Sequence, residues 1–157
     1  MKDFPKLIIS VAACELVGVV GIPFTIVSIP TWYTFLSKPS FSPPNWIFGP
    51  VWTILYFLMG ISLYLILIKG MKKKEIRQSI RFFIAQLVCN FLWSLFFFGL
   101  HSPVLGLIDS IFLLSLILLT VKTFYTLSKP AAYLLVPYLL WVSFALILNI
   151  AIIVLNP

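Results

Sequence analysis

The stretch that decides the fold is WYTFLSKPSFSPPNWIFGPVWTILYFLMG, which runs from Trp32 to Gly60. Its first half cannot be helical, because Pro39, Pro43 and Pro44 each remove a backbone donor and disfavour helical backbone in the residue before. Its second half is a long apolar run that begins after Asn45, a candidate helix N-cap. The stretch therefore predicts a rigid aromatic loop that leads directly into a membrane-length helix, and such a loop is suited to cover a site.

The composition outside this stretch indicates a membrane protein. The chain is 62% hydrophobic and only 10% charged, whereas soluble domains are about 45–50% apolar and about 25% charged. Five apolar stretches are long enough to span a membrane, which takes about 20 residues. They cover residues 7–29, 46–68, 82–100, 104–125 and 133–155. We therefore predict an all-α membrane protein, a single domain of five transmembrane helices with a lid loop over residues 30–45. The first stretch is a poor signal peptide, because it is too long and contains Glu15.

The positive charges predict the orientation of this bundle. Of the 11 lysines and arginines, all but Lys38 lie near the N-terminus, between the second and third stretches, or around the turn between the fourth and fifth. With five spans, these three regions share one side of the membrane. The positive-inside rule then places the N-terminus in the cytoplasm and the C-terminus outside the cell membrane. The net charge of +7 reflects this topology and attraction to anionic membrane lipid, so it requires no nucleic acid partner.

Three of the predicted helices carry a stripe of aromatic side chains, joined in two of them by carboxamides, at steps of three or four residues, which places each stripe on one helix face. The stripes are Phe48, Trp52 and Tyr56; Gln86, Asn90, Trp93 and Phe97; and Tyr138, Trp141, Ala145 and Asn149. If they converge, they line an apolar pocket with a few polar groups, the usual composition of a small-molecule site. A flat aromatic ligand would stack on Trp52 and Trp141, while Ala145 leaves room. The carboxamides could equally form hydrogen bonds between helices.

Several isolated polar groups have two interpretations each. A carboxylate inside a span is energetically costly, so Glu15 either pairs with a lysine near the basic side, stays protonated, or has a function. Asp109 could bind the backbone of the neighbouring loop, and His101 could be solvated or could bind a haem iron. Cys14 and Cys89 are most simply small core residues. The sequence contains no metal-ligand cluster and no hydrolytic triad, so we predict no metal site.

The quoted stretch, together with QLVCNFLWSLFFF (residues 86–98), Asp109 and VPYLLWVSFALILN (residues 136–149), resembles the translocator protein family, also called tryptophan-rich sensory proteins or peripheral-type benzodiazepine receptors. The resemblance implies a five-helix bundle, often a homodimer, that binds porphyrins and isoquinoline carboxamide or benzodiazepine ligands. Some bacterial members promote light-dependent oxidative degradation of protoporphyrin IX, for which Trp52 and Trp141 would be the catalytic residues. The drug-pocket positions of the family fall on Ile22, Phe48, Asn90, Leu105, Ala145 and Leu148.

This function would need no obligatory cofactor, because the bound porphyrin acts as photosensitiser and molecular oxygen as oxidant. We expect further ligand contacts from Trp32, Tyr56, Trp93, Tyr138 and Asn149. On the lid, Lys38 would contact the porphyrin propionates, next to Pro43 and Pro44. The chain departs from the family at the end of the last span, where LNIAIIVLNP lacks the sterol-recognition Tyr and basic residue. The alternative functions are a transporter of porphyrin or another lipophile, and a ligand-responsive membrane sensor without catalysis.

Overall fold

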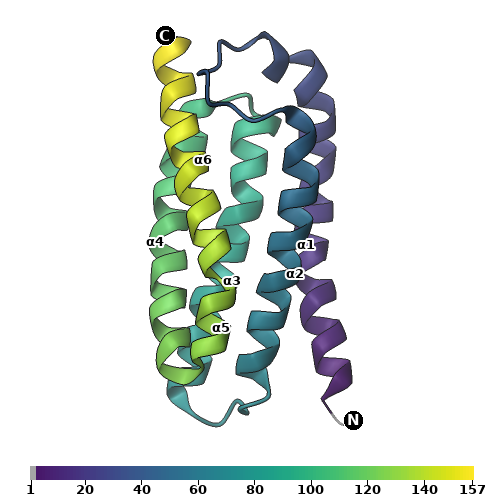
Figure 1. Ribbon diagram of the computed structural model, residues 1–157, viewed down its shortest axis with the longest axis vertical. Coiled ribbons are helices and arrows are strands. Elements are labelled where there is room, and N and C mark those ends of the chain that lie inside the picture. The colour runs from purple at the N-terminus through teal and green to yellow at the C-terminus, as the bar shows by residue number, and fades with distance from the viewer. Residues whose placement is uncertain (1–2) are drawn as a thin grey trace.

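The computed structural model describes residues 3–157, and within that range it contains helices and turns but no strand (Figure 1). The helices are α1 (Phe4–Thr31), α2 (Phe48–Leu67), α3 (Lys74–Ser94), α4 (Pro103–Leu127), α5 (Lys129–Leu134) and α6 (Val136–Leu155). Two short 3₁₀ turns, η1 (Tyr33–Phe35) and η2 (Asn45–Ile47), and a π-helical turn, η3 (Leu95–Gly99), complete the list. With α5 and α6 counted as one broken rod, five helices are long and apolar enough to cross a membrane. The predicted fold class is therefore confirmed.

Some helix boundaries differ from the predicted spans. Helix α3 begins at Lys74, eight residues before the predicted start at residue 82, so Arg77 and Arg81 are helical. Hydropathy misses these eight residues because six of them are polar or charged, although Lys, Glu, Gln and Arg are good helix formers. The prediction that Asn45 is the N-cap of α2 is wrong, since Asn45 opens the η2 turn and makes no capping hydrogen bond.

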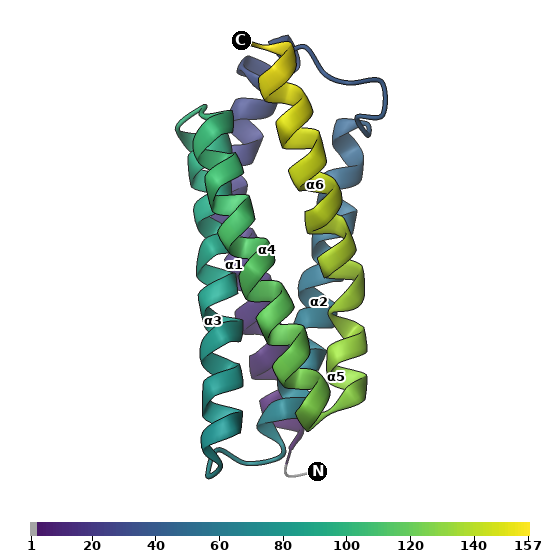
Figure 2. The same cartoon turned by 90° about the vertical axis from the view of Figure 1, so that its left-hand side faces the viewer.

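The five rods form a closed ring. Going around it, α1 packs on α2, α2 packs on the rod of α5 and α6, this rod packs on α4, α4 packs on α3, and α3 packs on α1. Figure 2 shows α4 running obliquely across the bundle, with α3 on one side and α6 on the other. The two termini lie at opposite ends (Figure 1). Residues 30–45 lie at the end that holds the C-terminus, and the basic α2–α3 connection lies at the end that holds the N-terminus. Which end faces the cytoplasm stays our prediction from the charges.

Glycine allows α1 and α2 to touch at one place and to separate elsewhere. A Cβ added to Gly60 would lie 2.5 Å from the Cα of Val11, so the two backbones are in direct contact there. Seven residues after Val11 in α1, Gly18 faces the ring of Tyr56, which would lie 2.6 Å from a Cβ at Gly18. A Cβ at Gly49, near the start of α2, would meet nothing within 4 Å. The α1–α2 contact is therefore tight near Gly60 and open near Gly49.

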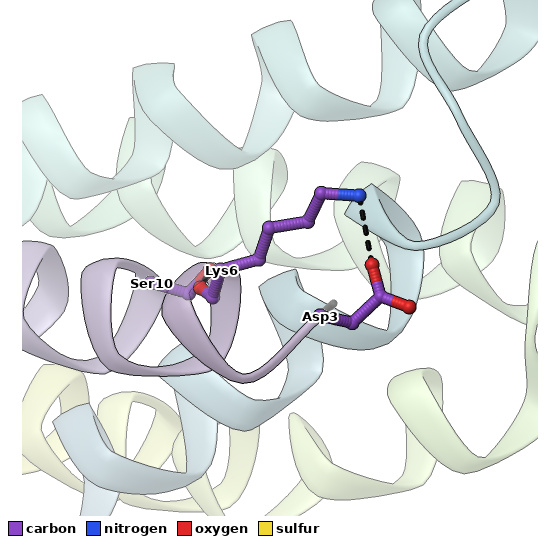
Figure 3. A network of polar contacts seen from close by, with 3 residues as sticks. All are labelled: Asp3, Lys6 and Ser10. Carbon is purple, nitrogen blue, oxygen red and sulfur yellow. Dashed lines mark hydrogen bonds and ion pairs between the residues drawn. The ribbon is translucent and has the colours of Figure 1, made fainter. Parts of the chain in front are cut away.

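Polar contacts fasten the chain at both ends of the bundle. At the C-terminal end, the side-chain amide of Asn156 accepts from the Ser37 N–H (3.0 Å) and donates to the Ser37 carbonyl (2.9 Å), which ties the first loop to α6. Nearby, the Ser28 hydroxyl donates to the Phe98 carbonyl at 2.6 Å. At the opposite end, the ammonium of Lys6 pairs with Asp3 at 2.9 Å, and Ser10 donates to the Lys6 carbonyl at 2.7 Å (Figure 3).

Tyrosines gather at the end of the bundle where α4 meets α5. The rings of Tyr125 and Tyr133 are 6.1 Å apart, and the ammonium of Lys129 lies 5.6 Å from the ring of Tyr125. At the other end of the bundle Trp46, in the η2 turn, is 73% exposed. Exposed Trp and Tyr are typical of the two interfaces between membrane and water.

Candidate functional site

A cavity of about 390 Å³ lies between α1, α2, α3 and α6, on the half of the bundle that carries residues 30–45. Helix α4 contributes no residue to its lining. Sites for small molecules usually measure about 300–1,000 Å³ and are largely apolar. The cavity has this size and composition, so it is the candidate ligand site.

The three predicted stripes converge on this cavity. Each of the three helices contributes both an aromatic residue and a smaller or polar one. Nine predicted site residues line the cavity, namely Ile22, Phe48, Trp52, Tyr56, Asn90, Trp93, Trp141, Ala145 and Leu148. Helical periodicity predicted seven of them, because a buried face repeats every three or four residues, whereas Ile22 and Leu148 were predicted from the family resemblance alone.

The two tryptophans expected to be catalytic lie in one aromatic wall. The ring of Trp52 lies 5.5 Å from that of Tyr56, and the ring of Trp141 lies 6.1 Å from that of Phe48. Both indoles are only partly buried, because one side of each borders the cavity. Partly buried indoles beside an apolar space can stack on a flat aromatic ligand.

A buried hydrogen-bonded chain supports this wall from behind. The Tyr56 hydroxyl donates to Oδ1 of Asn90, whose Nδ2 donates to the Tyr138 hydroxyl at 3.0 Å. Tyr138 in turn donates to Oε1 of Gln86 at 2.7 Å. These four side chains join α2, α3 and α6, and each is at most 6% exposed. The interhelical interpretation of the carboxamides therefore holds for both Gln86 and Asn90, and Asn90 borders the cavity as well.

Tyr138 and Asn149 share the predicted stripe of α6 but do not line the cavity. At about 100° of rotation per residue, these two lie roughly 60° or more around the helix from Trp141 and Leu148. They face the neighbouring helices instead. In its hydrogen-bonding orientation, the Asn149 amide donates to the Pro103 carbonyl and accepts from the Leu107 N–H, each at 3.0 Å. Asn149 therefore joins α6 to the start of α4.

Trp32 and Leu105 also lie outside the lining. Trp32 follows the end of α1, and its ring stacks on His101 with a centroid distance of 4.7 Å and an interplanar angle of 17°. Leu105 belongs to α4, which stands away from the cavity, and is 40% exposed. The neighbouring Tyr33, which is 2% exposed, enters the lining in place of Trp32.

The loop residues expected to contact propionates lie beyond the cavity lining. The Lys38 ammonium donates to the carbonyls of Tyr33 (2.7 Å) and Leu36 (3.0 Å) and lies 4.7 Å from the centroid of the Tyr33 ring. Burial lowers the pKa of Lys38. Pro43 and Pro44 shape the same loop without reaching the lining. Lys38 thus holds the loop together through the loop's own backbone.

Sequence reasoning missed several lining residues. Gly18 and Gly21 of α1 were not among the predicted site residues, but they line the cavity and make room for the Tyr56 ring and for Ser94. Phe98 reaches the lining together with Phe97 because both lie in the π-helical turn η3. Such turns recur at functional sites, but no pattern in an apolar sequence marks one.

The isolated polar groups now have definite positions. Glu15 lines the cavity. Asp109 is 6% exposed and lies outside the lining, and its Oδ2 has no hydrogen-bond partner. His101 lies 3.1 Å from the Ser28 hydroxyl, also outside the lining, so it does not point to a haem in this cavity. Within residues 3–157 no three His, Cys, Asp or Glu side chains gather as a metal site would require.

The fold defines a multi-pass integral membrane protein, and the cavity inside its helical bundle has the size of a small-molecule site. The chain belongs to the TspO/MBR family, whose model matches residues 10–155. It is 46% identical to the tryptophan-rich protein TspO of Chlorobaculum tepidum over 156 residues, which is 99% of both chains. It is 48% identical to the tryptophan-rich protein TspO of Archaeoglobus fulgidus over 151 residues, 96% of this chain and 97% of the relative. The human translocator protein is 37% identical over 120 residues, 75% of this chain and 70% of the relative.

Proposed function

We propose that the cavity binds a tetrapyrrole and that the protein promotes light-dependent oxidative degradation of protoporphyrin IX. The observation that carries this proposal is the placement of Trp52 and Trp141, from two different helices, in the lining of one cavity. The same cavity would accept isoquinoline carboxamide and benzodiazepine ligands, which are also aromatic and largely apolar. The homodimer expected from the resemblance stays a prediction.

In this proposal the bound porphyrin supplies the light-driven chemistry, with molecular oxygen as the oxidant. The chain's own residues bind the ring and shield it from water. Trp52 and Trp141 stack against the macrocycle, and Tyr56 and Phe48 hold the two indoles in place. The Tyr56–Asn90–Tyr138 hydrogen bonds fix the depth of the cavity floor.

The propionates would lie at the end of the cavity near the first loop. Asn45 lines the cavity there and can donate from its amide. Lys38 could contact a propionate only after its ammonium leaves the carbonyls of Tyr33 and Leu36. We therefore place Asn45 ahead of Lys38 as the first polar contact of the carboxylates.

The test is illumination of protoporphyrin IX bound to the purified protein, with loss of porphyrin absorbance as the readout. Replacing both Trp52 and Trp141 by Phe should slow the decay at least about tenfold, a difference of about 1.4 kcal/mol in activation free energy. Trp46→Phe is the matched control, because Trp46 is 73% exposed and does not line the cavity. Unchanged decay in the double variant would overturn the catalytic role.

The transporter and sensor alternatives are separated by two further measurements. A transporter would move protoporphyrin across a proteoliposome membrane in the dark without forming a product. A sensor would change its capture of a partner protein when protoporphyrin is added. Light-dependent product formation without dark transport supports the degradation proposal.

A further inference from the structure

Glu15 lies near the middle of α1, far from both ends of the helix. It is 11 residues from Phe4 and 16 from Thr31, which at 1.5 Å per residue corresponds to about 17 Å and about 24 Å. Counted from residue 7, where the predicted span begins, Glu15 is still eight residues or about 12 Å along the helix, which is farther than a glutamate side chain reaches. The carboxyl group is therefore placed inside the hydrocarbon region, deeper than its position in the sequence suggested.

Within residues 3–157, Glu15 is the one Asp, Glu, Lys or Arg that lines the cavity. It makes no ion pair there, since the pair found in that range joins Lys6 to Asp3 (Figure 3). Tyr56, which also lines the cavity, does not supply a donor either, because its hydroxyl gives its hydrogen to Asn90. A carboxylate in apolar surroundings is costly without a partner. A ligand that donates a hydrogen bond to Glu15 would supply that missing partner.

The cavity reaches the outer surface of the bundle between α1 and α2. Val19 and Ile22 line it and are still 54% and 45% exposed, and across from them Thr53 of α2 is exposed as well. The contact of Gly60 with Val11 closes the gap toward the N-terminal end, and the space around Gly49 leaves it open toward the other. In a membrane this lateral opening meets lipid acyl chains, so the ligand that enters it must be lipid-soluble.

We propose that Glu15 is a ligand-binding residue that selects, among flat apolar molecules entering from the bilayer, those that present an N–H or protonated nitrogen to this end of the cavity. The nitrogen donates to the Glu15 carboxylate, and the aromatic body lies along the lining toward Trp52. A carboxylate on the ligand is repelled by Glu15 and points to the other end, where Asn45 lies. The inference rests on the proposed function only in taking this cavity as a ligand site, and not on any photochemistry.

The experiment compares three probes of nearly the same shape on the full chain in lipid nanodiscs. At neutral pH, 9-aminoacridine carries a positive charge and N–H donors, acridine is largely neutral, and acridine-9-carboxylate is anionic. Binding is followed by quenching of tryptophan fluorescence, with empty nanodiscs as the background for partition into lipid. The wild type should bind 9-aminoacridine most tightly and the carboxylate most weakly.

Glu15→Gln keeps the shape of the side chain and removes its charge. We expect 9-aminoacridine to bind about tenfold more weakly, as the loss of one charge-assisted hydrogen bond implies. Acridine should bind as before and the carboxylate should bind more tightly. Asp109→Asn is the matched control, because Asp109 is also a carboxylate within a span but does not line the cavity. It should leave the order and the ratios unchanged.

Two results would overturn the role of Glu15. One is an equal loss for all three acridines in Glu15→Gln, which would make the residue structural. The other is an unchanged ratio of 9-aminoacridine to acridine affinity. Neither result bears on the proposed degradation of protoporphyrin, which is tested separately by illuminating the variant in which Trp52 and Trp141 are replaced by Phe. A wild type that binds none of the acridines also overturns the inference, and if it fails to bind protoporphyrin as well, the proposed function falls with it.

Discussion

Gly60 of α2 and Val11 of α1 are in backbone contact, since a Cβ on Gly60 would stand 2.5 Å from the Cα of Val11. Close approach of two membrane helices at a small residue is a common source of their association. Here the contact also closes one end of the gap between α1 and α2, and so it bounds the lateral opening of the cavity.

Gly60→Ala should destabilise the protein, because the new methyl group must push α1 away from α2. We expect a loss of about 1–3 kcal/mol in the free energy of unfolding, as for other overpacked sites, measured by chemical unfolding in detergent micelles. Gly49→Ala in the same helix is the control, since its methyl group meets nothing within 4 Å. It should be neutral or stabilising by up to about 1 kcal/mol. Equal effects of the two variants would contradict the contact.

Tyr138→Phe should break the buried chain behind the cavity. The variant leaves Nδ2 of Asn90 and Oε1 of Gln86 without their partner, and a buried polar group without a partner costs about 1–3 kcal/mol. The unfolding free energy should fall by that amount. Tyr133→Phe, at a tyrosine that is 60% exposed, should change it little. A Tyr138→Phe protein as stable as the wild type would show that the chain is energetically unimportant.

Asn156→Ala should release the first loop from α6. The Ser37 N–H donates to the Asn156 side chain, so its exchange with deuterium should accelerate up to about tenfold when a bond worth about 1 kcal/mol is lost. Asn156→Asp keeps the acceptor oxygen but loses the donor, and it should give an intermediate rate. Hydrogen exchange read by mass spectrometry on peptides that span residues 33–44 measures both. No change in either variant would mean that the loop is held elsewhere.

Ala145→Phe should fill the cavity. The added ring enters the space between Trp141 and Leu148 and should weaken protoporphyrin binding at least about tenfold, a change of about 1.4 kcal/mol. Ile147→Phe, two residues away on the exposed side of α6, adds an aromatic ring outside the lining and should bind normally. Absorbance titration in the dark compares the two. Normal binding by Ala145→Phe would place the ligand outside this cavity.

The predicted orientation can be tested by labelling cysteines on intact cells. In a background where Cys14 and Cys89 are replaced by Ser, Ser40→Cys should react with a membrane-impermeant maleimide, because the first loop is predicted to lie outside. Lys72→Cys, in the basic α2–α3 connection, should react only after the cells are opened. The reverse pattern would mean that the positive-inside rule fails for this chain.

Sequence reasoning reached the fold and much of the site because both depend on periodic patterns. The apolar runs marked five helices, and the stripes around Trp52, Asn90 and Trp141 marked the faces that meet. It did not show that Trp141 faces the cavity while Tyr138 faces the neighbouring helices. Two side chains three residues apart still differ by about 60° around the helix axis. The direction in which a helix turns its stripe is decided by packing against its neighbours, which periodicity does not describe.

The first loop could be recognised from its sequence but not oriented. Proline excluded a helix there, yet nothing in the pattern indicated that Tyr33 and not Trp32 would face the cavity. Lys38 was expected to face a ligand because it is the one cation on its side. In the structure it satisfies carbonyls of its own loop, and unpaired carbonyls in an irregular segment cannot be counted before its backbone is known.

The exposed Trp46 at one end and the Tyr125–Tyr133 pair at the other fix the depth at which the bundle is immersed. Aromatic side chains of this kind settle at the level of the lipid headgroups, so they act as two girdles that register the protein against the thickness of the bilayer. A thinner bilayer would bring the headgroups nearer to the mouth between α1 and α2, and a thicker one would cover it with acyl chains. The lipid composition of the membrane, through its thickness, therefore influences which molecules can enter the cavity.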